Sequence, residues 1–209
     1  MSALEGTAYM QGRRDEVPNQ ELARKLASGR DRRGVREIAE NLWNKDKNIQ
    51  ADCIKVIYEV GYIDPALIAP YVNDFLKLIK NKNNRLVWGG MIALATVAPL
   101  KPDTIFAHRD EIQRVMKTGS VITVDNGVLA LARAASRNAK YRKAIFPFLM
   151  AHLKTCRPKD VPQHCEKVLV AVDASNKAQF VTVLRARLAD LSGGGLQRVT
   201  KVIKAADAL

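Results

Sequence analysis

Two histidines and two cysteines lie close together in the last third of the chain. His152 and Cys156 are four residues apart, and His164 and Cys165 follow after a short interval. Imidazole nitrogen and thiolate sulfur are ligands that Zn²⁺ prefers, and a spacing of four places the first two residues on one helix face. However, the neighbours His164 and Cys165 would point about 100° apart on a helix, and the closely paired cysteines of structural zinc motifs do not occur. We therefore predict no metal site and no cofactor.

Residues that perform catalysis form no recognisable set. The sequence contains no nucleophile elbow, no ordered Ser/His/Asp set and no motif of paired carboxylates. Its three cysteines are widely spread, which is typical of reduced thiols in a cytoplasm. The start of the chain has no apolar stretch of signal-peptide length. We predict a cytoplasmic protein without catalytic residues.

The charge of the chain favours binding over catalysis. Its 209 residues include 34 lysines and arginines against 21 acidic residues, so the formal net charge is +13. This surplus favours an acidic protein or a polyanion as partner. The hydrophobic content of 47% allows a substantial core. The least polar stretch, "RLVWGGMIALATVAPL" at residues 85–100, is shorter than the roughly 18 residues of a membrane span, so we predict a buried segment.

The sequence contains an internal repeat, which predicts the helices that carry these residues. The segment "IKVIYEVGY" from Ile54 returns as "MIALATVAP" from Met91 and "VLALARAAS" from Val128, at a period of 37 residues, and a fourth copy follows from Cys165 in a register of 38. Apolar columns recur in each copy and in a second amphipathic segment before it: Ile57, Leu94, Leu131 and Leu169; Val60, Val97, Ala134 and Val172; Ile38, Phe75, Ile112 and Leu149; Leu42, Ile79, Met116 and Leu153. Spacings of three and four between columns predict helices.

Each repeat therefore consists of a helix A, a short polar turn and a helix B. We expect A helices near residues 31–44, 64–80, 102–117 and 139–155, and B helices near residues 49–62, 85–98, 121–136 and 161–174. Capping helices are expected at residues 18–28 and 176–191. Residues 1–16 are predicted to be a disordered tail, residues 17–192 the repeat domain, and residues 193–209 a glycine linker followed by an amphipathic helix.

The repeats resemble HEAT repeats. Helix A with an internal proline, "LIAPYVNDFLKLIK", the turn "NKNN" and helix B, "RLVWGGMIALATV", follow that pattern, and the similarity extends over about residues 30 to 175. The third A helix lacks the proline and Pro147 lies out of register in the fourth, so an irregular stack is expected there. The resemblance implies an all-α, armadillo-like solenoid: a right-handed superhelix of about four helical hairpins, with A helices convex, B helices concave, and a scaffold or adaptor role.

A column of small residues runs through the B helices. It contains Cys53, Gly90, Gly127 and Cys165. Small side chains let each B helix approach its neighbour closely, which offsets the roughly 1 kcal/mol by which glycine is worse than alanine in a helix. The column also assigns Cys53 and Cys165 to the core, which is a further argument against zinc.

The resemblance also provides one enzyme hypothesis. HEAT-like alkylpurine DNA glycosylases use a basic concave face with aromatic residues and an aspartate, and Trp88 and Asp125 lie one repeat apart on successive B helices. The tryptophan and aspartate clusters that distinguish those enzymes are not matched. We therefore interpret Trp88 as packed over the repeat junction and Asp125 as an acidic residue near a helix N-terminus, where the helix dipole favours it.

Basic residues concentrate in the turns between A and B helices, and these turns project from one edge of a solenoid. They are Lys45, Lys47, Lys80, Lys82, Arg85, Lys117, Lys154, Arg157 and Lys159. One interpretation is that they are only solvated turn residues. We predict instead that this basic edge, with Trp88 and the concave groove, binds an acidic protein partner. A nucleic-acid-binding solenoid is the alternative, and a glycosylase ranks third.

Overall fold

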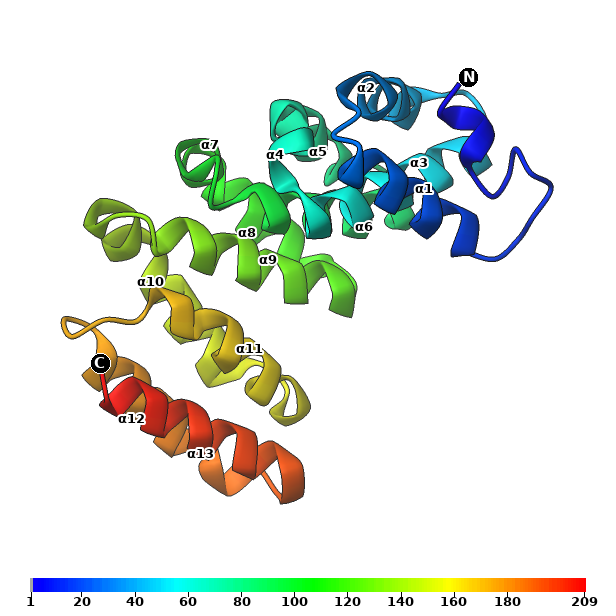
Figure 1. Ribbon diagram of the computed structural model, residues 1–209. Helices are drawn as coiled ribbons and strands as arrows, with labels where there is room; N and C mark the ends of the chain where they lie inside the picture. The colour runs from blue at the N-terminus through cyan, green and yellow to red at the C-terminus, as the bar shows by residue number, and fades with distance from the viewer. Residues whose placement is uncertain (1) are drawn as a thin grey trace.

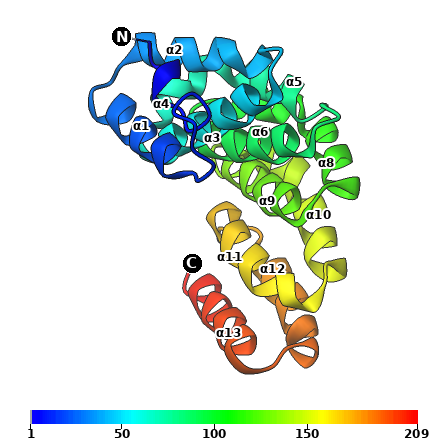
Figure 2. The ribbon, with the colours of Figure 1, turned by 90° about the vertical axis from the view of Figure 1, so that its right-hand side faces the viewer.

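The computed structural model describes residues 2–209. These residues form helices, turns and short loops, and no strand. The helices stack in chain order in two layers, and the two termini lie at opposite ends of the array (Figures 1 and 2). The B layer contains α1 (Val17–Ser28), α3 (Lys47–Ile63), α6 (Asn84–Val97), α9 (Val121–Ala135), α11 (Val161–Val168) and α13 (Gly193–Asp207). Each of these helices packs against the next one in the layer.

The A layer covers the other side of the B helices. It contains α2 (Arg32–Glu40), α4 (Pro65–Ile68) with α5 (Val72–Leu78), α7 (Pro102–Ala107) with α8 (Arg109–Thr118), α10 (Ala139–Thr155) and α12 (Lys177–Arg187). Short 3₁₀ turns follow or connect the A helices at Asn41–Trp43, Ala69–Tyr71 and Leu188–Asp190, and flank α11 of the B layer at Pro158–Asp160 and Leu169–Ala171. The predicted helical hairpins are confirmed, although α11 ends several residues before the expected boundary.

Polar side chains fix where the helices begin. The side chain of Asp46 accepts a hydrogen bond from the Asn48 N–H at the start of α3, and Asn83 does the same for the Arg85 N–H at α6. Ser120 caps α9 through the Thr123 N–H. These contacts satisfy backbone donors that a helix N-terminus leaves without a partner. The A-to-B turns therefore have defined geometry.

The repeat columns form the core. All of the column residues are buried except Leu169, which is half-buried and packs against the core. The small-residue column is also confirmed: Cys53 and Cys165 are fully buried, and a Cβ added to Gly90 would lie 3.2 Å from the Phe75 carbonyl oxygen. Gly90 therefore lets α6 approach α5 of its own repeat closely.

The positions of prolines predict only some of the breaks in the A helices. The second A helix is divided near Pro70 as expected, but the third is divided at His108 without any proline. In contrast, α10 remains one helix although Pro147 lies inside it. An internal proline removes one hydrogen bond and usually bends or breaks a helix, so packing against the neighbouring helices overrides that local preference here.

Residues 2–16 correct the prediction of a disordered tail, and Met1 lies outside the described residues. The Glu37 carboxylate accepts a hydrogen bond from the Ala3 N–H at 2.9 Å. Asn19, which is 1% exposed, accepts one from the Ala8 N–H at 2.9 Å and donates to Asp52 at 2.9 Å. Side-chain hydrogen bonds to the backbone hold this segment, hereafter the N-terminal strap, against α1, α2 and α3. They leave no periodic signal in the sequence.

Replacing Asn19 with alanine is expected to release the N-terminal strap. The substitution leaves the buried Ala8 N–H without its acceptor, which costs about 1–3 kcal/mol. Limited trypsin digestion should then cleave after Arg13 or Arg14 much faster than in the wild type. Gln20→Ala, on the neighbouring position of α1, is the control and should digest like the wild type. Equal cleavage rates in the two variants would contradict a role for Asn19 in holding the strap.

The C-terminal helix belongs to the array. The glycines that the sequence suggests as a linker form the first turn of α13, which begins at Gly193. This helix packs against α11 and α12, so α12 and α13 form a further hairpin at the end of the array. Among the described residues, no helix combines the length and apolar character that crossing a membrane requires.

Candidate partner-binding surface

The structure places the basic edge on the surface. Eight of the nine predicted basic residues are exposed, while Arg85 and Trp88 are partly buried. Three members form ion pairs: Lys80 with Glu111 at 3.3 Å, Arg157 with Asp160 at 2.6 Å, and Arg85 with Glu16 at 3.2 Å. The other six pair with no acidic side chain in the described part of the chain; they are Lys45, Lys47, Lys82, Lys117, Lys154 and Lys159. Most of the positive charge on this edge is uncompensated.

Arg85 and Trp88 belong to a packed aromatic cluster. The Arg85 guanidinium lies 6.0 Å from the Trp88 ring centroid, and the Trp88 ring lies 5.9 Å from that of Tyr58. Lys55 lies beside Tyr58 and binds Glu16 and Glu59, each at 2.8 Å. Burial alone would lower the pKa of Lys55, but these two hydrogen bonds raise it well above its ordinary value. Trp88 is thus held by its neighbours rather than presented as an open stacking surface.

Two pockets lie between successive A-to-B turns and bring some of the basic residues together. A pocket of about 230 Å³ lies between the second and third turns, where Lys80 and Lys82 line it. A pocket of about 310 Å³ lies between the third and fourth turns, where Lys117 and Arg157 line it. Each pocket therefore has two cationic side chains at a concave part of the edge.

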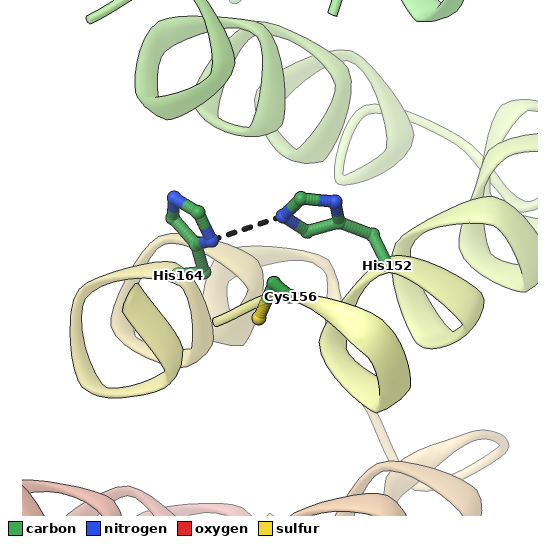
Figure 3. A group of neighbouring side chains, drawn as sticks. All are labelled: His152, Cys156 and His164. Atoms are coloured by element: carbon green, nitrogen blue, oxygen red, sulfur yellow. Dashed lines mark hydrogen bonds between the residues drawn. The ribbon is translucent and has the colours of Figure 1, made fainter. Parts of the chain in front are cut away.

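The larger of these two pockets also contains the histidine cluster that the sequence analysis considered. His152 Nε2 lies 2.9 Å from His164 Nδ1, and the two rings come from α10 and α11 (Figure 3). The other ring nitrogen of His164, Nε2, lies 2.7 Å from Asp125 Oδ1 on α9. The Cys156 thiol is close by, and one ligand atom from each of His152, Cys156 and His164 lies within 4.8 Å of the others.

Burial sets the protonation of this cluster. It lowers the pKa of His152 to about 4, and the charge of His164 acts in the same direction. Burial also raises the pKa of the Cys156 thiol. For Asp125, burial would raise the pKa, but the hydrogen bond from His164 and the charge of Lys167 hold it below its ordinary value. At neutral pH His152 is therefore neutral and Asp125 is ionised.

Cys165 does not join the cluster. It is fully buried, its sulfur lies 3.2 Å from the Pro162 carbonyl oxygen, and burial raises its pKa to about 12. It belongs to the small-residue column, as the sequence predicts.

Asp125 has partners that differ from the expected one. The sequence analysis relates it to Trp88, one repeat earlier, but its carboxylate accepts hydrogen bonds from His164 and, at 3.0 Å, from Gln163, one repeat later. Gln163 is separated from Asp125 by the repeat spacing of 38 residues. The repeat period, counted from Asp125 toward the C-terminus, leads to Gln163 and His164, so the sequence could have indicated that Asp125 lies beside the histidine cluster.

Comparison with known proteins identifies the fold. No family model and no curated protein matches the chain. One engineered protein of known structure matches 100% of this chain and 98% of its own, with a TM-score of 0.67 and 17% identity. A second engineered protein matches over 100% of both chains, with a TM-score of 0.68 and 16% identity.

A designed armadillo repeat protein in complex with the peptide (KR)4 is also similar. The match has a TM-score of 0.68 and 13% identity, and covers 90% of this chain and 85% of the designed chain. Together these likenesses show an armadillo-like, HEAT-like helical repeat solenoid. The all-α superhelix predicted from the sequence is confirmed.

Proposed function

We propose that this solenoid is a non-catalytic adaptor that binds an acidic segment of a partner protein along its basic edge and the adjoining B-helix face. The observation that supports the proposal most directly is the row of six lysines that, among residues 2–209, have no acidic partner, on successive turns of one edge. Like charges held close together on a surface repel one another, and an acidic partner relieves that repulsion.

One pocket on the edge favours a peptide-like partner. The pocket between the second and third turns is open to solvent and is lined by Lys80 and Lys82, with no acidic residue in its lining, so it suits a single Asp or Glu side chain. The turns are regularly spaced along the edge, and the side chains of an extended peptide are regularly spaced along the peptide. A designed armadillo protein of the same fold was solved with the peptide (KR)4, which is basic. By charge complementarity, a solenoid with a net charge of +13 suits an acidic peptide.

Nucleic acid is the alternative partner, because a phosphate backbone would also neutralise a row of lysines. Binding of single strands relies on aromatic side chains that stack on the bases. Trp88 is partly buried between Arg85 and Tyr58, which disfavours that mode. Binding of duplex DNA does not need stacking side chains, so the binding experiment below includes duplex DNA.

The test reverses the charge of three unpaired edge residues, Lys82, Lys117 and Lys159, to glutamate. Binding of an acidic peptide is expected to weaken at least about tenfold at low salt, and wild-type binding should itself fall between low and physiological salt, since the screening length shortens to about 8 Å. Arg85 stays unchanged because its guanidinium binds Glu16. Fluorescence anisotropy with labelled acidic peptide, single-stranded DNA and duplex DNA measures the three affinities in parallel.

The matched control carries the same change in charge elsewhere. Lys25, Lys143 and Lys204 are exposed and lie outside the A-to-B turns, so their triple glutamate variant should bind the peptide nearly as well as the wild type at physiological salt. An equal loss of peptide affinity in both variants would mean that only the net charge of the protein matters and would contradict a binding site on the basic edge. Preferential binding of either nucleic acid would replace the adaptor with the nucleic-acid-binding alternative.

A further inference from the structure

We propose that His152, Cys156 and His164 bind one divalent transition metal ion of the zinc type, with Asp125 orienting His164. The sequence analysis predicts no metal because Cys165 belongs to the core column and no pair of closely spaced cysteines occurs. With Cys165 in the core, the structure leaves three ligand atoms of suitable chemistry on α10 and α11, together at one pocket. This inference does not depend on the proposed partner-binding function.

The two imidazoles already face each other at nearly the required separation. Zinc binds histidine nitrogen at about 2.0–2.1 Å, so two nitrogens of a tetrahedral site lie about 3.3 Å apart. His152 Nε2 and His164 Nδ1 are 2.9 Å apart, and a shift of a few tenths of an ångström would admit the ion. Phe148, one helical turn earlier, lies with its ring nearly parallel to that of His152, the centroids being 6.4 Å apart. The nitrogens are therefore positioned before an ion arrives.

Asp125 supplies the outer-shell contact that metal-binding histidines have. An ionised carboxylate only accepts hydrogen bonds, so His164 Nε2–H donates to Asp125 Oδ1 at 2.7 Å. In the neutral imidazole this leaves the lone pair on Nδ1, the nitrogen that faces His152. Carboxylate–histidine–metal arrangements fix the tautomer and the ring orientation in this way. His164 is 1% exposed, so its ring has little freedom to turn elsewhere.

Cys156 completes the set from the C-terminal end of α10. Its side chain is half-buried, and its sulfur makes a weak contact with the Leu153 carbonyl oxygen at 3.8 Å and lies near the Arg187 side chain. Rotation about the Cα–Cβ bond can bring the sulfur toward the two nitrogens, which lie within 4.8 Å of it. On binding, the thiol releases its proton to water and the thiolate sulfur donates an electron pair to the ion.

The pocket provides access and a fourth position. It has a volume of about 310 Å³, opens to solvent, and is lined by all three ligand residues together with Asp125 and Asp160. Three protein ligands and one position open to water or to an incoming group are typical of zinc sites that are not closed structural sites. Asp125 adds a carboxylate beside the site, while Asp160 in the same lining pairs with Arg157 at 2.6 Å.

The experiment uses tag-free protein and Co²⁺, which replaces Zn²⁺ in such sites and absorbs light. The wild type is expected to bind one equivalent of Co²⁺, with visible absorption of a tetrahedral ion and a near-ultraviolet thiolate charge-transfer band. Cys156→Ser should lose the charge-transfer band. His152→Ala should weaken binding by more than a hundredfold, and Asp125→Asn by about 10- to 100-fold, as for other outer-shell partners.

Two control variants change a histidine and a cysteine that lie outside the cluster. His108 lies in the third repeat, and Cys165 lies in the core, so His108→Ala and Cys165→Ala should both keep the spectrum. Circular dichroism checks the fold of each variant, and Cys156→Ser decides the matter if His152→Ala does not fold. A wild type that binds no stoichiometric Co²⁺, or a charge-transfer band that survives Cys156→Ser, would overturn the proposal and leave the two histidines as a hydrogen-bonded structural pair.

Discussion

Replacing Arg187 with methionine is expected to lower the free energy of unfolding by about 1–3 kcal/mol, the cost of leaving buried carbonyl acceptors without their donor. Arg187 lies on α12 and is 8% exposed. Its guanidinium donates to the Leu153 carbonyl oxygen at 2.6 Å and to that of Cys156 at 2.9 Å, at the C-terminal end of α10. It also pairs with Asp190 at 2.6 Å. Methionine fills similar volume but leaves these acceptors without a donor.

Arg185→Met provides the matched control. Arg185 is on the same helix, but its side chain is 63% exposed and its partner Asp207 lies 3.5 Å away. Exposed pairs of this kind contribute about 0–1 kcal/mol. Urea denaturation followed by circular dichroism measures both variants. If the two differed by less than about 1 kcal/mol, the contacts of Arg187 would not stabilise the junction of α10 and α12.

Gly90→Leu is expected to destabilise the protein by about 2–3 kcal/mol through overpacking. An added Cβ alone would lie 3.0 Å from the Leu78 Cβ and 3.2 Å from the Phe75 carbonyl oxygen, and the rest of the leucine side chain has no space. The helix propensity of leucine offsets less than about 1 kcal/mol of this. For a chain of this size the melting temperature should fall by about 4–12 °C.

Gly194→Leu is the control, because it makes the same substitution at a glycine that no other side chain contacts. An added Cβ at Gly194 meets no atom within 4 Å, and the residue lies in the first turn of α13, so leucine should leave the melting temperature unchanged or raise it slightly. Thermal melts of both variants measure the difference. A Gly90→Leu protein as stable as the wild type would mean that α5 and α6 are not in close contact.

Much of the fold could be predicted from the sequence because its core repeats. Columns such as Ile38–Phe75–Ile112–Leu149 recur at a period of 37 residues and are fully buried. Burial of one apolar stripe per helix determines which face points inward, so periodicity is sufficient for the helical hairpins. The break at His108 was not predictable in this way, since no proline or glycine marks it in the sequence.

The N-terminal strap could not be predicted because polar contacts hold it. Glu37, Asn19 and Asp52 bind its backbone across sequence separations of 11 to 43 residues, and no local pattern reports such pairings. For the histidine cluster, the sequence contained the ligand types but not their positions. The repeat column assigned Cys165 to the core, but only the structure shows that His152, Cys156 and His164 lie together without it.

The contacts of Glu16 make the two ends of this array unequal. Terminal repeats have only one neighbour, so a one-dimensional array tends to open from its ends. At the N-terminal end, Glu16 bridges Lys55 of α3 at 2.8 Å and Arg85 of α6 at 3.2 Å, and the Lys55 side chain is only 7% exposed. At the C-terminal end, the ion pairs of α13 with its neighbours, Arg198–Glu166 and Arg185–Asp207, are exposed and contribute little, so apolar packing holds this helix. We therefore expect local unfolding to start at α13 and to move inward, while the N-terminal helices form the more stable end.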